Sequence, residues 1–164
     1  MTSDAAAVPA ASAAPSSAEY RERLVPGPGM FIALLLVAPA VALITTPINI
    51  NAAIPAGIIV YLIAAVTLIL LSPTIRVTGG TLVAGHASIP VSQLGEIELL
   101  GASRLRAAIG PGLDARSYLL VRGWVNRGIR IENIDPNDPA PVWIITTRHP
   151  QKLADTIRSA QTGK

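Results

Sequence analysis

Charged residues are missing from one long stretch of the chain, and this gap predicts its main architectural feature. Between Arg23 and Arg76 no charged side chain occurs, and apolar residues occupy every face of a helix drawn through the stretch. A bilayer core of about 30 Å requires roughly 20 apolar residues per helical crossing. The 52 residues of the gap therefore predict two transmembrane helices, at about 30–46 and 53–72, in a hairpin that occupies residues 20–73.

Prolines and a possible processing site interrupt this apolar stretch. Pro39 lies within the first predicted crossing and removes one backbone hydrogen bond, so it predicts a kink. Pro55 suits the first turn of the second helix, where a missing N–H is harmless. The Ala38-Pro39-Ala40 segment has the small residues of a signal-peptide cleavage site. The apolar run continues through Ile44, however, which disfavours a cleaved signal peptide.

After Pro73 the apolar residues recur with a period of two, which is typical of half-buried strands. Gly79-Gly80 separates two such runs and predicts a tight hairpin. A run of Asp, Asn and Pro at 135–139 predicts a turn, and Pro150 predicts the start of a helix. Strands are expected near 74–78, 81–83, 87–91, 96–100, 118–124, 128–134 and 142–147, with a short helix at 102–109 and a C-terminal helix from Pro150.

The chain is therefore expected to have three parts. Residues 1–19 are mostly Ala, Ser and Pro, and with so little apolar surface to bury they are expected to form a disordered tail. The hairpin follows, and residues 74–164 then form an α+β domain of six or seven short antiparallel strands covered by one helix. This order of elements resembles a pleckstrin-homology-like barrel, particularly the membrane-tethered bacterial kind. A fold of this type does not by itself imply a function.

The distribution of charge predicts an orientation for the hairpin. The chain carries 13 Lys and Arg against 10 Asp and Glu, and its pI is about 9.8. Arg21 and Arg23 precede the first predicted crossing, Arg76 follows the second, and the turn between them has no charge. The positive-inside rule then places both termini on the cytoplasmic side of the plasma (inner) membrane. The chain has no cysteine, which excludes disulfides and thiolate chemistry.

The histidines and carboxylates do not follow the pattern of a catalytic, cofactor-binding or metal site. His86 and His149 lie in separate predicted loops without the spacing of metal ligands. Asp135 and Asp138 lie among turn-forming residues, where a bond to a nearby backbone N–H is favoured over acid–base work. Neither predicted crossing carries a charged side chain for proton or ion transport. The chain is expected not to be an enzyme and to need no cofactor.

One group of residues is basic and forms the candidate binding site. Gathered on one side of the domain, these arginines would attract anionic lipid headgroups or a protein partner. The alternative is an ordinary solvated surface with a positive-inside bias. Nucleic acid is not expected as a partner, because aromatic residues do not alternate with the arginines. The candidate residues are Arg104, Arg106, Arg116, Arg122, Trp124, Arg127 and Arg130.

Several segments together resemble a known family. They are Tyr20-Arg21-Glu22-Arg23-Leu24, Leu113-Asp114-Ala115-Arg116, Arg122-Gly123-Trp124, Asp135-Pro136-Asn137-Asp138-Pro139 and Trp143-Ile144-Ile145-Thr146-Thr147-Arg148-His149-Pro150. In these the chain resembles an uncharacterised family of alanine-rich, two-span membrane proteins of actinobacteria (domain of unknown function 3093). Gly123 stands where the family suggests Pro, and Val142 where it suggests an aromatic residue. The resemblance implies the two-span architecture and brings no activity.

Two functions are expected from these observations. In the first, the chain is an integral inner-membrane protein whose domain is a binding or scaffolding module for lipid headgroups or a protein partner in the membrane. In the alternative, it is an accessory subunit of a membrane transporter or envelope-synthesis complex and acts through its hairpin. Gly57, Ala64 and Ala65 would supply the small surface for helix packing in that case.

Overall fold

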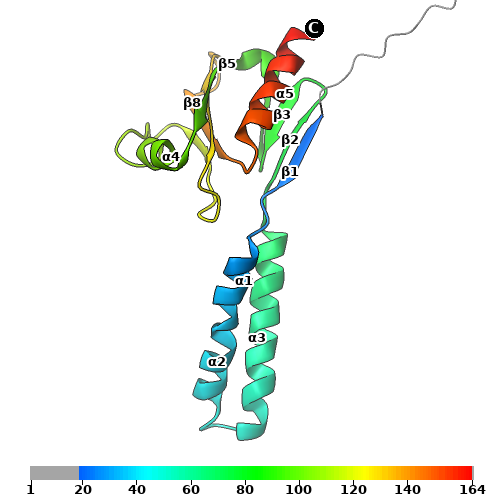
Figure 1. Ribbon diagram of the computed structural model, residues 1–164, viewed down its shortest axis with the longest axis vertical. Helices are drawn as coiled ribbons and strands as arrows, with labels where there is room; N and C mark the ends of the chain where they lie inside the picture. The colour runs from blue at the N-terminus through cyan, green and yellow to red at the C-terminus, as the bar shows by residue number, and fades with distance from the viewer. Residues whose placement is uncertain (1–18, 164) are drawn as a thin grey trace, which may run out of the picture.

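The computed structural model describes residues 19–163, so the tail predicted for residues 1–19 lies outside the described residues except for Glu19. A β-rich part and a long apolar helical hairpin follow one another along the longest axis of the molecule (Figure 1). In chain order the elements are β1 (Tyr20–Arg23), α1 (Pro28–Leu35), α2 (Val37–Thr45), α3 (Ile50–Leu70), β2 (Thr74–Thr78), β3 (Thr81–Ala84), β4 (Ala87–Pro90), a 3-10 turn (Val91–Gln93), β5 (Leu94–Leu100), α4 (Ala102–Ala108), β6 (Tyr118–Leu120), β7 (Gly128–Asn133), β8 (Val142–Thr146) and α5 (Pro150–Thr162).

The first apolar helix consists of two halves, α1 and α2, which are separated at Leu36. Pro39 has no N–H to donate to the carbonyl of Leu35, and its ring crowds that carbonyl. At the break, the N–H of Leu36 donates to the carbonyl of Ala33 at 3.2 Å, in a tighter turn than that of an α-helix. The interruption predicted from Pro39 is therefore confirmed.

The second apolar helix, α3, begins earlier than its apolar run suggests. The side chain of Asn49 accepts hydrogen bonds from the backbone N–H groups of Asn51 at 3.0 Å and Ala52 at 3.3 Å, so the helix begins at Ile50. Pro55 consequently lies inside the helix and not in its first turn, where the sequence pattern put it. The two apolar helices, Pro28–Thr45 and Ile50–Leu70, are both long and apolar enough to cross a membrane.

The helices of the hairpin are in close contact at a glycine. A Cβ built on Gly57 would lie only 2.4 Å from the backbone oxygen of Ala38, so no larger residue fits without moving the helices apart. Gly57 and Ala53 are the buried residues of α3 within the hairpin. The helix faces that point away from this contact expose large apolar side chains, with Leu43 of α2 at 75% and Ile50 of α3 at 72% of full exposure.

The first sheet contains strands from both sides of the hairpin. Its order is β1-β2-β3-β4, and β1 pairs antiparallel with β2 in a register that places Tyr20 opposite Val77 and Arg23 opposite Thr74. The pattern of charges assigned residues 20–23 to the hairpin part of the chain, but their backbone belongs to the sheet. The reason is a long-range one, because the strand that completes their hydrogen bonding lies some fifty residues later. The hairpin is thus an insertion within one sheet.

The second sheet has the order β5-β7-β8-β6. The prediction of antiparallel strands is wrong for one pair, since β6 runs parallel to β8. The strand predicted for 118–124 also ends at Leu120. The hydroxyl of Thr146 donates to the carbonyl of Leu120 at 3.0 Å and accepts from the N–H of Arg122 at 3.1 Å, so a side chain takes over the pairing there.

Helix α5 completes the core of the β-rich part. It lies beside the two sheets (Figure 1), and its buried residues Leu153, Ala154 and Ile157 form its apolar face. Leu153 and Ile157 pack with residues of both sheets, including Ile75 and Val77 of β2, and Ile129 of β7. The predicted C-terminal helix that covers the sheets is therefore confirmed, and the molecule is an α+β protein.

Candidate functional site

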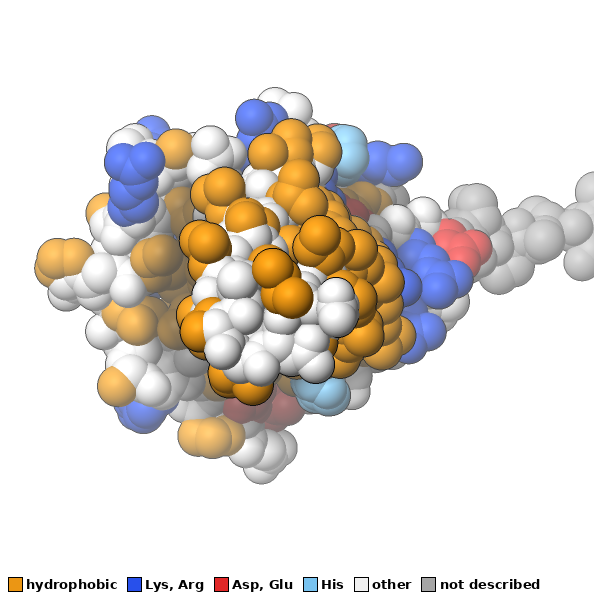
Figure 2. Space-filling model, turned by 90° about the horizontal axis from the view of Figure 1, so that it is seen from below, with side chains coloured by type: hydrophobic (Ala, Val, Ile, Leu, Met, Phe, Trp, Pro, Cys, Tyr) orange, Lys and Arg blue, Asp and Glu red, His pale blue; other side chains and the backbone are white. Residues whose placement is uncertain are grey.

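The seven candidate residues are spread over several elements of the β-rich part. Three of them, Arg122, Trp124 and Arg127, lie in the segment between β6 and β7, whose yellow loop extends toward the hairpin in Figure 1. Arg104 and Arg106 lie on α4, Arg116 lies before β6, and Arg130 lies on β7. Seen along the hairpin in Figure 2, basic side chains occur at separate places around the molecule and do not form one continuous patch.

Nearby carboxylates accompany three of the arginines. Arg104 Nη1 lies 3.8 Å from Glu98 Oε1, and Arg130 stands opposite the same glutamate in the register of β5 and β7. Arg116 Nη2 lies 3.0 Å from Asp114 Oδ2. The hydrogen bonds from Arg116 hold the pKa of the Asp114 carboxyl below its ordinary value. These arginines have local partners and are weaker candidates for a shared site.

The segment 121–127 has contacts that hold its side chains near the hairpin. Trp124 Nε1 donates to the carbonyl of Leu24, just before α1, at 3.3 Å, and the guanidinium of Arg122 lies 6.0 Å from the centre of the same indole ring. Arg122 also lines a hollow of about 430 Å³ beside the end of α3, together with Leu70 and Leu71. Trp124 is thus partly buried and acts as a structural anchor of the loop.

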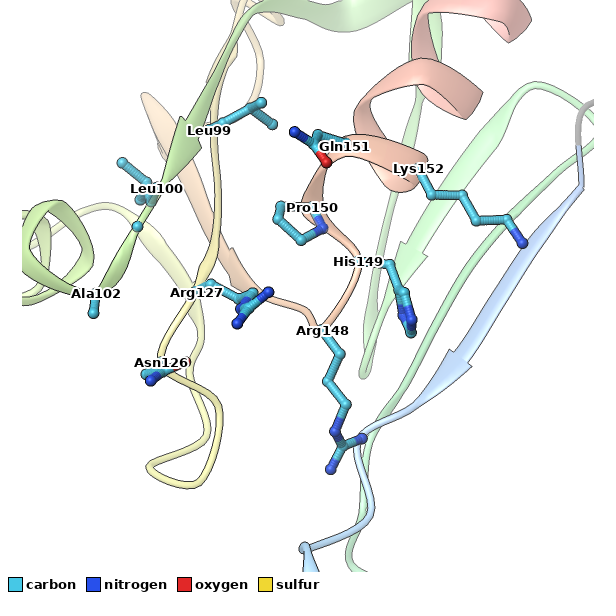
Figure 3. A pocket seen from close by; sticks show the side chains of 11 residues that line it. Leu99, Leu100, Ala102, Asn126, Arg127, Arg148, His149, Pro150, Gln151 and Lys152 are labelled. Atoms are coloured by element: carbon cyan, nitrogen blue, oxygen red, sulfur yellow. The ribbon is translucent and has the colours of Figure 1, made fainter.

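A larger cavity lies where α5 begins, and we call it the α5 pocket. Its volume is about 560 Å³, and residues 99–102, 126–127 and 148–152 line it. Three of these residues are basic, Arg127, Arg148 and Lys152, while no carboxylate among residues 19–163 lines the pocket. In Figure 3 the Arg127 side chain extends from its loop toward the segment that contains Pro150. The pocket is therefore lined by basic residues from two segments, and in Figure 3 the Arg148 and Lys152 side chains extend away from that of Arg127.

A polar network holds the chain before α1 against the pocket. Glu22 accepts hydrogen bonds from the hydroxyl of Tyr20 at 2.6 Å, from the hydroxyl of Thr147, and from the backbone N–H of Arg148 at 3.0 Å. The guanidinium of Arg148 donates to the carbonyl of Val25 and points toward the hairpin side in Figure 3. Burial, and then the hydrogen bond to Glu22, raise the pKa of Tyr20 above its ordinary value.

Sequence patterns gave no indication of this network or of the pocket. Arg148 belongs to one of the segments that resemble the family, and Lys152 falls within the predicted C-terminal helix. Their basic character was visible in the sequence. Their proximity to Arg127 depends on the pairing of β7 with β8 and on the corner that leads from β8 into α5.

The aspartates of the 135–139 segment have structural roles. Asp135 accepts a hydrogen bond from the N–H of Asn137 at 2.9 Å, and Asp138 accepts one from the N–H of Ala140 at 2.9 Å. Both carboxylates thus close turns, as their sequence context predicts. Within residues 19–163, no group of three or more His, Asp or Glu side chains is arranged to hold a metal ion.

The whole described chain, apart from its last residues, matches one family. The family described as "Protein of unknown function (DUF3093)" matches residues 19–157, and the chain belongs to this family. No curated protein and no solved structure matches the chain. The match begins at the strand that precedes the hairpin and ends within α5, so it includes the polar network and the α5 pocket.

Proposed function

We propose that this protein is a non-enzymatic integral protein of the inner membrane whose β-rich part binds anionic lipid headgroups at the cytoplasmic face. In this proposal α1–α2 and α3 cross the bilayer, and both termini are cytoplasmic. The β-rich part acts as a membrane-tethered scaffolding module. Its two four-stranded sheets and the covering helix α5 support the likeness to a pleckstrin-homology barrel, although the parallel pairing of β6 with β8 departs from that plan.

The dimensions and surface of the hairpin support insertion in a bilayer. At 1.5 Å rise per residue, the helices of 18 and 21 residues extend about 27 and 32 Å, close to the thickness of a hydrocarbon core. Their outward faces expose isoleucine and leucine side chains along both helices. In water this continuous apolar surface would be unfavourable, whereas in lipid it is solvated.

The charges at the two ends of the hairpin support the orientation. Arg21, Arg23 and Arg76 lie at the end joined to the sheets, and the turn at 46–49 has no charge. Arg23 donates from Nη2 to the carbonyl of Ile69 at 2.7 Å, so its charge is held at the base of α3. Positive charge at this end favours the cytoplasmic side.

One observation carries the binding proposal: β1 and β2, which are paired with each other, lead directly into the two helices of the hairpin. In this proposal the sheet is therefore held close to the bilayer surface, and the segment 121–127 extends toward the hairpin (Figure 1). Arg122 and Arg127 would then meet lipid headgroups, and each basic residue near an anionic membrane contributes about 1 kcal/mol.

The test uses full-length protein in nanodiscs of phosphatidylcholine, with and without phosphatidylglycerol, and hydrogen exchange of residues 121–127 as the readout. Anionic lipid is expected to slow exchange in this segment, and the Arg122→Ala/Arg127→Ala double variant is expected to lose most of that effect. The matched control, Arg104→Ala/Arg106→Ala, removes two charges from α4 and should behave as the wild type. Equal exchange in both kinds of nanodisc would overturn the proposal.

The alternative, action through the hairpin on a transporter or an envelope-synthesis enzyme, loses part of its basis. Gly57 faces Ala38 within the hairpin, so this small residue already serves the contact between α2 and α3. Ala64 and Ala65 are half-buried in the same hairpin. A protein partner that co-purifies equally with wild type and with the Arg122→Ala/Arg127→Ala variant would nevertheless favour this alternative.

A further inference from the structure

We infer that the α5 pocket binds a phosphate group, carried either by the headgroup of an anionic lipid or by a small soluble phosphate ester. This inference deepens the proposed function, on which it rests for the lipid source. It names a ligand chemistry and a built cavity that the loop residues Arg122 and Trp124 do not supply. The pocket lies at the end of α5 that is nearest the hairpin (Figure 1).

The charges of the pocket are the first support. Arg127, Arg148 and Lys152 line it, and none of them takes part in the side-chain ion pairs found among residues 19–163. The neighbouring carboxylate is that of Glu22, which lies outside the lining and whose oxygens accept from Tyr20, Thr147 and the backbone of Arg148. An arginine-rich concavity without a lining carboxylate selects an anion.

The size and composition of the cavity are the second support. Its volume of about 560 Å³ lies within the range of roughly 300–1,000 Å³ that is usual for small-molecule sites. Leu99, Leu100 and Pro150 supply apolar walls, and Asn126 supplies an amide beside the cations. Such a lining suits a phosphate group attached to a small organic part, because the charge and the attached group each find a matching surface.

The rigidity of one cation is the third support. The backbone N–H of Arg148 donates to Glu22 at 3.0 Å, and its guanidinium donates to the carbonyl of Val25. On the other side, the N–H of Thr147 donates to the carbonyl of Arg127 at 3.1 Å, which ties the two arginine-bearing segments together. The backbone segments that carry Arg127 and Arg148 are therefore fixed before a ligand arrives, which lowers the entropic cost of binding.

Two titrations of the full-length protein in nanodiscs separate the sources of phosphate. In the first, glycerol 3-phosphate is titrated calorimetrically into protein in pure phosphatidylcholine. In the second, phosphatidylglycerol is mixed into the bilayer, and hydrogen exchange of residues 126–127 and 148–152 is followed. Saturable binding in the first identifies a soluble ester as ligand, and protection in the second without binding in the first identifies a lipid headgroup.

The variants are Arg127→Ala and Lys152→Ala, with Arg158→Ala as the matched control on the outer face of α5. Each pocket variant is expected to weaken binding about fivefold, and the control is expected to leave it unchanged. Lys152 is exposed in the first turn of α5, so its variant keeps the test valid even where Arg127→Ala disturbs folding. Absence of binding in both titrations, or equal binding by wild type and both variants, would overturn the inference.

The inference and the proposed function fail separately. Slowed exchange of residues 121–124 in anionic nanodiscs, together with an empty pocket in both titrations, leaves the proposed membrane contact standing and removes the phosphate site. Saturable binding of glycerol 3-phosphate in neutral nanodiscs, with no response of residues 121–124 to anionic lipid, supports the phosphate site and removes the proposed membrane contact.

Discussion

The close approach of the two apolar helices leads to a prediction in which two effects oppose each other. Replacing Gly57 by alanine adds a methyl group that would lie 2.4 Å from the backbone oxygen of Ala38 and 3.1 Å from its carbonyl carbon. Backbone atoms cannot turn aside as a flexible side chain does, so the helices must separate. Alanine is nevertheless the better helix former of the two residues.

The magnitudes decide which effect dominates. Overpacking in a well-packed site costs typically 1–3 kcal/mol, and a clash with backbone belongs at the upper end, at about 3 kcal/mol. The higher helix propensity of alanine returns about 1 kcal/mol. We therefore expect Gly57→Ala to lower the free energy of unfolding of the hairpin by about 2 kcal/mol.

The chain supplies its own control for this experiment. Gly29 lies in α1, and a Cβ built there would meet nothing within 4 Å. Gly29→Ala makes the same chemical change without the clash and should leave the hairpin as stable as the wild type or slightly more stable. Unfolding of both variants in mixed micelles of increasing SDS content, followed by far-UV circular dichroism, gives the comparison. A Gly57→Ala variant as stable as Gly29→Ala would refute the close packing of α2 against α3.

Three further predictions concern the β-rich part. Glu22→Ala removes the acceptor of three hydrogen bonds and should lower stability by about 2 kcal/mol in denaturant unfolding followed by tryptophan fluorescence, while an unchanged midpoint would contradict the network. Because its pKa is raised in the folded state, Tyr20 contributes stability that is complete below the unfolded-state pKa of about 10 and is lost as pH rises above it; Tyr20→Phe should flatten this alkaline decline in pH-dependent melting. Arg116→Ala should raise the pKa of Asp114 toward its ordinary value in a carboxyl NMR titration without changing stability at neutral pH.

The elements that the sequence predicted correctly depend on local signals. Gly79 and Gly80 both adopt positive φ, at 58° and 74°, in the tight turn between β2 and β3 that their sequence predicts. The apolar positions of α5 and the missing charges of the hairpin are likewise read within one segment. Each of these features is determined by residues that are neighbours in the chain, so a sequence pattern is sufficient for it.

The elements that the sequence missed depend on distant partners. Tyr20–Arg23 is short and charged, and nothing in it shows that β2 will supply its hydrogen bonds across the inserted hairpin. The parallel direction of β6 is likewise a result of long-range pairing, because β6 adds to the edge of β8 that β7 leaves free. The candidate site follows the same rule: basic residues are evident in the sequence, but whether Arg104 faces Glu98 or Arg127 faces a cavity depends on strand pairing and on loops.

The insertion of the hairpin within a sheet also explains why the pocket and the apolar helices belong to one unit. The N–H of Leu24 donates to the carbonyl of Pro73 at 2.9 Å, so the two segments that leave the sheet are still hydrogen-bonded at the first residue beyond it. Glu22, on the first of these chains, holds the backbone of Arg148 at the mouth of the α5 pocket. A displacement of α1 along its axis would therefore move β1 and Glu22, and through Glu22 it would shift the backbone of Arg148. A tether joined by one flexible linker would transmit no such displacement, whereas this doubly joined hairpin fixes the position and the orientation of the pocket relative to the apolar helices.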